Sequence, residues 1–154
     1  MKWRDAIMNI YFVCTGNTCR SPMAAAILSN KNISNVAVKS AGIYALEGGE
    51  MSVNAQEVLN EKGIAHAHKS NVVTEADLNW ADLVLTMTKA HKELLLRYYP
   101  HIIDKVFTLK EYTTSKMDLD VSDPYGGDLN TYRQTFEELS ELIKHLETRF
   151  KEEL

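Results

Sequence analysis

At 154 residues the chain has the length of one ordinary domain, and a content of 45% hydrophobic and 25% charged residues excludes disordered and fibrous proteins. Its net charge is −4, and its lysines and arginines are spread along the sequence, which argues against nucleic acid as a partner. An anion would therefore have to be bound locally, by backbone dipoles and one or two cations.

The N-terminal segment contains no clear targeting signal. Its apolar run is broken by Asn9, is too short for a membrane span and lacks a small-residue cleavage site. We therefore expect a cytoplasmic protein without a membrane partner. One domain should cover residues 1–154, with residues 1–7 as a possible N-terminal extension.

Short apolar runs then alternate with amphipathic segments, in the βαβ order of α/β proteins. The runs at 8–13, 37–41, 83–87 and 105–109 predict strands, and the segments between them are long enough to be crossover helices. Crossover helices make successive strands parallel. The predicted fold is a three-layer αβα domain, with a four-stranded parallel sheet and helices on both faces.

Three helices can be located from their end signals and apolar spacing. Ser21 followed by Pro22 resembles an N-cap and a first-turn proline, and Gly63 can end a helix that begins near Ser52. The last helix has one apolar stripe that should pack on the sheet. Its members are Tyr132, Phe136, Leu139, Ile143, Leu146 and Phe150.

The segment from Cys14 to Ser21 lies between the first strand and the first helix, at the carboxyl edge where parallel sheets bind ligands. Gly16 permits backbone conformations forbidden to other residues, and Asn17 tolerates a left-handed one. Successive N–H groups of Thr15, Gly16, Asn17, Thr18 and Cys19 could then surround one anion above a helix N-terminus.

Cys14 and Arg20 flank this loop as a possible nucleophile and anion clamp. The helix terminus, the loop amides and the guanidinium would favour the thiolate of Cys14, which is the nucleophilic form. Arg20 could grip two phosphate oxygens through its planar fork. The alternative is an inert core cysteine and a surface arginine. A zinc site at Cys14 and Cys19 would need two further ligands, and the five histidines show no paired metal spacing; His66 and His68 come nearest to it but lie far along the chain. We therefore expect no metal and no cofactor.

With this loop, and with Asp123 and Pro124 near the C-terminus, the sequence from about Met8 onward resembles the low-molecular-weight protein tyrosine phosphatase family. The resemblance implies a two-step reaction on phosphorylated proteins. Cys14 takes the phosphoryl group, Arg20 stabilises its oxygens, and Asp123 protonates the leaving group. Water then hydrolyses the phosphocysteine, with Asp123 as base.

The resemblance also assigns supporting roles. Ser21 corresponds to the family serine that bonds the cysteine sulfur, while Asn17, Ser40 and His68 correspond to a network that holds the loop; ordinary polar turn residues are the alternative. Cys19 corresponds to a second loop cysteine that can form a reversible disulfide with the nucleophile. Its alternative role is packing.

Two features concern the substrate. Thr18 stands where tyrosine phosphatases of the family usually carry isoleucine and where relatives acting on phosphoarginine carry threonine. Gly126 and Gly127 follow Tyr125, so one aromatic wall for a phosphotyrosine ring is missing, whereas Asp123 and Tyr125 could hold a guanidinium. The glycines could alternatively be a simple turn.

The resemblance favours a protein arginine phosphatase, with a protein tyrosine phosphatase as the second choice. Arsenate reductases share the fold, but those coupled to thioredoxin need a third cysteine and this chain has two. A phosphate or redox sensor without enzyme activity would not need Asp123.

Overall fold

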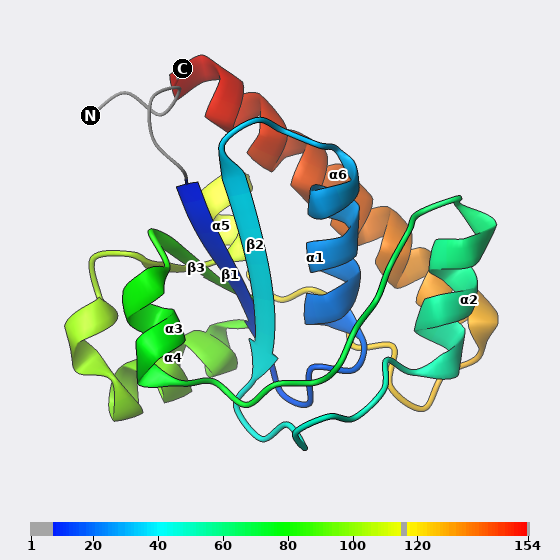
Figure 1. Cartoon of the computed structure of the whole chain (residues 1–154), viewed down its shortest axis with the longest axis horizontal. Coiled ribbons are helices and arrows are strands. Elements are labelled where there is room, and N and C mark those ends of the chain that lie inside the picture. Colours follow the sequence, from blue (N-terminus) through cyan, green and yellow to red (C-terminus); the bar gives the residue numbers. More distant parts are fainter. Residues whose placement is uncertain (1–7, 115–116, 154) are drawn as a thin grey trace.

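The computed structural model describes residues 8–114 and 117–153, so the suggested extension at 1–7 lies outside the described residues. Helices and strands alternate as the sequence predicts (Figure 1). In chain order they are β1 (Met8–Cys14), α1 (Arg20–Asn30), β2 (Val36–Gly42), α2 (Val53–Glu61), α3 (Glu75–Trp80), β3 (Leu83–Thr86), α4 (Lys89–Tyr98), the 3-10 turn η2 (Pro100–Ile102), β4 (Val106–Thr108), α5 (Leu109–Thr113) and α6 (Leu129–Glu153).

The four strands form one parallel sheet in the order β2-β1-β3-β4. The pairing of β1 with β2 runs from Met8 beside Val36 to Cys14 beside Gly42. Helices α1, α5 and α6 pack on one face, where α2 packs on α6, and α3 and α4 pack on the other face (Figure 1). The predicted three-layer α/β fold is therefore confirmed.

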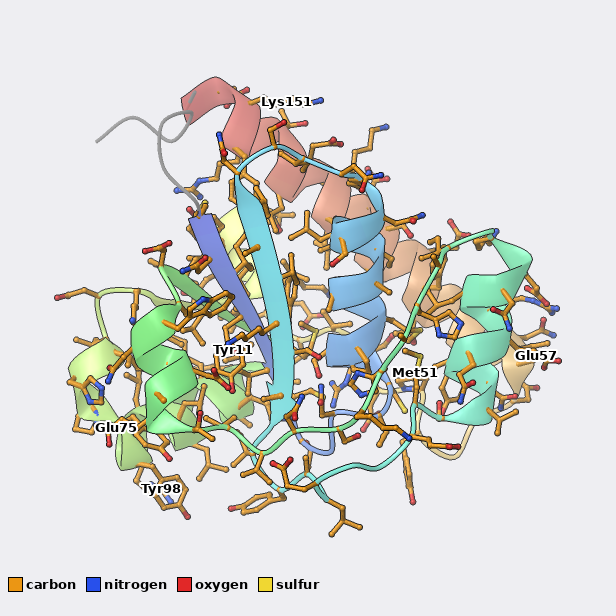
Figure 2. The ribbon with its side chains drawn as sticks, viewed as in Figure 1. Tyr11, Met51, Glu57, Glu75, Tyr98 and Lys151 are labelled. Atoms are coloured by element: carbon orange, nitrogen blue, oxygen red, sulfur yellow. The ribbon has the colours of Figure 1, made fainter. Side chains whose placement is uncertain are left out.

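Strand β1 contributes to the cores on both faces of the sheet. Ile10 and Phe12 point into the core beneath α1 and α6, while Tyr11 and Val13 point into the core beneath α3 and α4. Tyr11 lies between the sheet and α3 in Figure 2. This alternation follows the two-residue period of a strand, and burial on both faces explains why β1 reads as a continuous apolar run.

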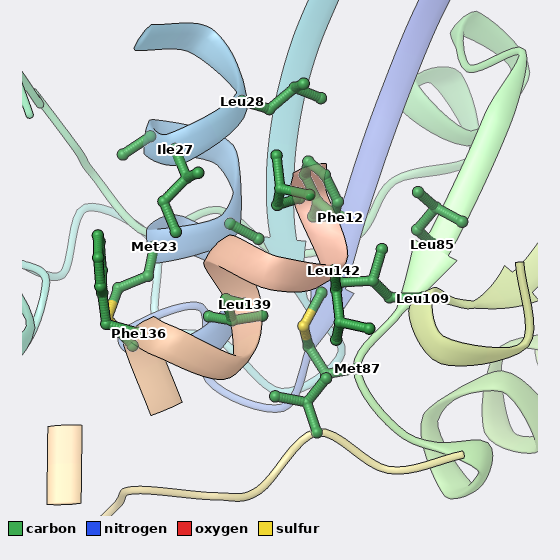
Figure 3. Close-up of a cluster of buried hydrophobic side chains, with 14 of the residues drawn as sticks. Phe12, Met23, Ile27, Leu28, Leu85, Met87, Leu109, Phe136, Leu139 and Leu142 are labelled. Atoms are coloured by element: carbon green, nitrogen blue, oxygen red, sulfur yellow. The ribbon is translucent and has the colours of Figure 1, made fainter. Parts of the chain in front are cut away.

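Helix α6 buries the predicted stripe against the sheet and α1. Phe136 and Leu139 lie close to Met23 and Ile27 of α1 in Figure 3, and Leu139 is fully buried. The stripe is wider than predicted because Leu142 is buried as well. Within the described ranges, no helix, α6 included, is both long and apolar enough to cross a membrane.

The predicted strand ends each differ by at most one residue from those observed, and two of the predicted boundaries are wrong for a clear physical reason. Helix α1 begins at Arg20, one residue before Ser21, and no side chain caps it. The Ser21 hydroxyl bonds the sulfur of Cys14 instead of a helix amide. Strand β4 ends at Thr108 because this residue caps α5 in a capping box with Glu111, which moves Leu109 into the helix. The helix expected from Ser52 to Gly63 is confirmed, with Ser52 as N-cap.

Candidate active site

The loop from Cys14 to Ser21 joins the carboxyl end of β1 to α1. Cys14 is the last residue of β1 and is only 3% exposed. Its Sγ lies 2.8 Å from the Ser21 Oγ, and the backbone N–H of Asn17 donates to it at 3.3 Å. Both hydrogen bonds aim at the sulfur from the interior of the loop. They are suited to stabilising negative charge on that atom.

Asn17 holds the loop in shape through its side chain. It has a φ of 56°, in the left-handed region, and it is fully buried. Its Nδ2 donates to Ser21 Oγ at 2.8 Å and to Ser40 Oγ at 3.0 Å, while its Oδ1 accepts from the backbone N–H of Asn71 at 3.0 Å. The loop is thereby tied to β2 and to the segment after α2.

The carbonyl of Asn17 accepts two further bonds from that same segment. His68 Nε2 lies 2.7 Å from this oxygen, and Ser70 Oγ donates to it at 2.9 Å. Because a carbonyl oxygen only accepts, His68 Nε2 is the donor. Burial lowers the pKa of His68, which favours the neutral ring. The structure thus brings together Asn17, Ser40 and His68, as the family resemblance implied. Ser70 and Asn71 were not foreseen, since nothing local marks them in the sequence.

Gly16 does not supply the unusual backbone conformation that we expected of it. Glycines with positive φ in the described part of the chain are Gly48, Gly63 and Gly126, so the left-handed residue of the loop is Asn17. A Cβ at Gly16 would make only ordinary contact, 3.7 Å from Thr18 Oγ1.

The glycine that the loop needs for space is Gly42, at the end of β2. A Cβ there would lie 2.5 Å from the Thr15 carbonyl oxygen and 2.8 Å from the Asn17 nitrogen. No side chain fits at these distances, so the loop can cross the end of β2 only over a glycine. Gly42 directly follows the predicted strand at 37–41, and a glycine in that place could have indicated that another backbone segment approaches closely.

Arg20 connects the loop to a segment one hundred residues away. It is 6% exposed; its NH1 donates to the Val121 carbonyl at 2.9 Å, and its NH2 lies 3.6 Å from Asp123 Oδ2. Val121 is held in turn by a bond from its backbone N–H to the carbonyl of Met87, next to β3. The structure therefore places Asp123 beside the cysteine loop.

The Asp123 segment is a tight turn. Asp123 Oδ1 accepts from the Tyr125 N–H at 3.1 Å, and the Gly127 N–H donates to the Pro124 carbonyl at 2.8 Å. Gly126 has a φ of 80°, which disfavours any residue with a side chain. Gly126 and Gly127 thus form a turn, and the positive φ of Gly126 disfavours an aromatic residue at that position. Tyr125 itself is 81% exposed.

Cys19 is buried on the helix side of the loop and is surrounded by hydroxyls. Its Sγ lies 3.4 Å from Tyr132 OH and 3.6 Å from both Ser52 Oγ and Thr18 Oγ1. Burial and the bond to Cys19 raise the pKa of Tyr132. Cys14 and Cys19 are free thiols in this structure. A disulfide between them stays a prediction.

His91, which sequence reasoning missed, reaches the loop from α4. Its Nε2 lies 2.7 Å from Thr15 Oγ1, and the residue is 8% exposed. Burial, followed by the nearby charge of Arg20, lowers the pKa of His91 to about 4. A lone histidine on an amphipathic helix gives no sequence signal of this contact.

A cavity of about 250 Å³ opens over the loop. Its lining consists of Cys14, Thr15, Gly16, Thr18, Cys19, Arg20, Asp123 and Tyr125. A larger hollow of about 550 Å³, between α1, β2 and residues 65–71, contains no cysteine. Among the residues that the structure describes, no three histidine, cysteine, aspartate or glutamate side chains are grouped to hold a metal ion.

The model of the family described as low molecular weight phosphotyrosine protein phosphatase matches residues 9–154. The chain belongs to this family. It is 49% identical to the protein-arginine-phosphatase of Geobacillus stearothermophilus over 94% of this chain and 97% of that one. It is 41% identical to the low molecular weight protein-tyrosine-phosphatase PtpB of Staphylococcus haemolyticus, over 92% of this chain and 99% of that one.

Solved structures agree with this membership. The YwlE arginine phosphatase of Geobacillus stearothermophilus superposes with a TM-score of 0.92 and 49% identity, covering 95% of this chain and 94% of that one. A YwlE arginine phosphatase mutant with a phosphorylated active-site serine gives a TM-score of 0.89 and 46% identity, covering 94% and 96%. The protein is therefore a cysteine-dependent phosphatase of this family.

Proposed function

We propose that this phosphatase removes phosphate from phosphoarginine in proteins, through a phosphocysteine intermediate. The carrying observation is the cavity in which Cys14, Arg20 and Asp123 meet, with Thr18 and Tyr125 in its lining. The arginine phosphatase relative, at 49% identity, supports this substrate. The tyrosine phosphatase relative, at 41%, makes phosphotyrosine the second candidate.

In the first step, Cys14 Sγ attacks the phosphorus atom. A sulfur–phosphorus bond forms, the phosphorus–nitrogen bond breaks, and Asp123 gives its proton to the departing guanidine nitrogen. Arg20 and the N–H groups of the loop bind the phosphoryl oxygens as charge develops on them. Arg20 must exchange its contacts with the Val121 carbonyl and with Asp123 for these oxygens, which leaves the neighbouring Asp123 free to carry the proton.

In the second step, water attacks the phosphocysteine and Asp123 accepts the water's proton. The sulfur–phosphorus bond breaks, and phosphate leaves. The Ser21 hydroxyl, 2.8 Å from Cys14 Sγ, stabilises the departing thiolate, together with the Asn17 N–H. The phosphorylated active-site serine of the YwlE mutant supports an intermediate carried by the nucleophile.

The mouth of the cavity suits a guanidinium better than a phenyl ring. Asp123 supplies a carboxylate, and the exposed ring of Tyr125 offers one face for a cation–π contact. A second aromatic at position 126 would be strained by the positive φ of the turn. A phosphotyrosine ring would thus have an aromatic neighbour on one side only.

The decisive experiment compares phosphoarginine and phosphotyrosine in peptides that are otherwise identical. We expect kcat/KM to be higher for the phosphoarginine peptide. Dominant turnover of the phosphotyrosine peptide would make this chain a tyrosine phosphatase and reject the first choice.

Thr18→Ile tests the substrate choice at one residue. The Thr18 side chain lines the cavity, where it contacts Cys19 Sγ at 3.6 Å. An isoleucine would replace a hydroxyl by apolar surface next to the scissile bond. We expect the ratio of kcat/KM values to shift by about tenfold toward phosphotyrosine.

The matched control for that change is Thr148→Ile on α6, whose hydroxyl donates to the Lys144 carbonyl of the same helix. It should leave the ratio unchanged. An unchanged ratio in Thr18→Ile would remove Thr18 from the argument for substrate choice.

We further propose that the enzyme is one cytoplasmic domain that acts on phosphorylated proteins, and that Cys14 and Cys19 form a reversible disulfide protecting the nucleophile. Mild peroxide should inactivate the enzyme, and a thiol reductant should restore it. In Cys19→Ser the same treatment should become irreversible. Equal recovery in Cys19→Ser would refute the protective disulfide.

A further inference from the structure

The buried ring of His91 touches the catalytic loop from outside it. His91 lies in the first turn of α4, where its backbone N–H donates to Thr88 Oγ1 at 3.1 Å. Helix α4 follows β3, the neighbour of β1, so His91 and the loop meet at the same edge of the sheet. The contact is the 2.7 Å approach of His91 Nε2 to Thr15 Oγ1.

The surroundings of the ring indicate which nitrogen carries its proton. Nδ1 is buried and has no hydrogen-bond partner among the residues that the structure describes. A proton on Nδ1 would leave a buried N–H unpaired, whereas a proton on Nε2 leaves only a lone pair unpaired, which is less costly. The Nε2–H therefore donates to the Thr15 hydroxyl oxygen.

The ring stays neutral at ordinary pH. The charged groups that face it are Arg20, Asp120 and Asp123. Burial and Arg20 outweigh the two carboxylates, and the pKa of His91 falls to about 4. A single ring proton, fixed on Nε2, thus sets the direction of the Thr15 hydroxyl.

Because the Thr15 oxygen accepts from His91, its own hydrogen can donate elsewhere. Thr15 lines the same cavity as Cys14 and Arg20, so the nearest use for that hydrogen is a bound anion. We propose that His91 is a positioning residue, whose Nε2–H orients the Thr15 hydroxyl to donate to an oxygen of the phosphoryl group during transfer. The inference rests on the proposed phosphatase reaction, but not on which side chain carries the phosphate.

A double-mutant cycle on p-nitrophenyl phosphate tests the pair. His91→Leu removes the orienting donor, and Thr15→Val removes the hydroxyl while keeping its shape. Each should lower kcat/KM by about tenfold, mainly through kcat, and the double variant should also lose about tenfold. Wild-type activity in Thr15→Val, or losses that multiply to about a hundredfold, would overturn the proposal.

Two further variants separate positioning from packing. His91→Gln keeps an N–H donor near the position of Nε2 and should regain most of the activity lost in His91→Leu. His145→Leu changes an exposed histidine on α6 and should leave kcat unchanged. If His91→Gln is as slow as His91→Leu while both unfold at the wild-type temperature, the donor has no role.

A measurement on the unmodified protein does not depend on how any variant folds. Nitrogen-15 spectra of the histidine rings distinguish the two neutral tautomers, and His91 should carry its proton on Nε2. A proton on Nδ1 would mean that Thr15 donates to His91 and would refute the proposal. Failure of phosphoarginine turnover, with the cycle on p-nitrophenyl phosphate intact, would reject only the substrate assignment.

Discussion

At the scale of single residues, Asn17 and Thr18 have different roles in the catalytic loop. Asn17 uses its N–H, its carbonyl and both polar atoms of its side chain within the protein. Thr18, next in the chain, lines the cavity; its hydroxyl lies 3.6 Å from Cys19 Sγ, and its carbonyl accepts from the Ser52 N–H. Asn17 therefore shapes the loop, and Thr18 lies open to the cavity.

Asp123→Asn should slow the phosphoarginine reaction by about a hundredfold in kcat, since a positioned general acid contributes on that order. The loss should be smaller with p-nitrophenyl phosphate, whose leaving group departs without a proton. Steady-state kinetics on both substrates check this. Asp104→Asn, on the loop before β4, is the control and should have wild-type rates. Equal losses on the two substrates would contradict the role of Asp123 as acid.

At the scale of elements, the end of β2 limits the shape of the catalytic loop. Gly42 pairs with Cys14 in the sheet, and the loop backbone passes directly over it. The N–H of Ile43 donates to the Cys14 carbonyl and that of Tyr44 to the Thr15 carbonyl, so β2 continues to hold the loop beyond the last strand pair. The position of the nucleophile thus depends on a neighbouring strand.

Gly42→Ala should displace the loop, because the new Cβ would lie within 3 Å of three loop backbone atoms. We expect kcat/KM to fall by about a hundredfold, with inorganic phosphate binding weakened as well. Titration with phosphate and steady-state kinetics measure the two effects.

Gly48→Ala is the control for Gly42→Ala. Its φ of 77° is strained for alanine, but open space surrounds the position. It should cost about 1 kcal/mol of stability and leave kcat unchanged. A Gly42→Ala enzyme with wild-type phosphate affinity would show that the loop adapts.

The elements themselves were predictable, but their ends were less so. The apolar runs at β1 and β3 stand out because both strands are buried on two faces, so pattern and burial coincide. The starts of α1 and α5 depend on which hydrogen bond a hydroxyl makes. Ser21 bonds a sulfur and Thr108 caps a helix, and that choice is set by tertiary neighbours.

At the scale of the whole molecule, the site is assembled from segments far apart in the sequence. The motif at Cys14 to Arg20 and the aspartate at position 123 were predictable because each has its own local pattern. His91, Ser70 and Asn71 were not, since each acts through one contact that exists only after the sheet has formed. Strand order, which brings α4 beside the loop, is the information that the local patterns lack.

Because His68 and His91 are buried or partly buried, we expect the free energy of unfolding to fall in acid. The pKa values of His68 and His91 are lowered on folding, in both cases chiefly by burial, and that of His91 falls to about 4. The unfolded chain therefore binds protons below about pH 6.5 that the folded protein does not. Above about pH 6.5 the two histidines are neutral in both states and do not destabilise the fold. As the pH falls from about 6.5 toward about 4, proton binding by the unfolded chain lowers the free energy of unfolding.

Urea unfolding at about pH 7 and about pH 5 measures this effect, and the free energy of unfolding should be lower at the more acidic pH. In His91→Gln the difference should shrink, because glutamine does not titrate. The exposed His145→Gln is the control and should keep the wild-type difference. An equal difference in all three proteins would mean that His91 does not titrate as stated.

The bonds that fill every polar atom of Asn17 also bear on how this enzyme could change in evolution. A substitution at Asn17 would break contacts to β2 and to the segment after α2 at once, whereas the side chain of Thr18 contacts the neighbouring Cys19 and Tyr125 is exposed. Tolerance to substitution is thus expected at two positions that line the cavity. New specificities on this scaffold should arise there, and a selection for altered substrates should recover changes at Thr18 and Tyr125 while leaving Asn17 untouched.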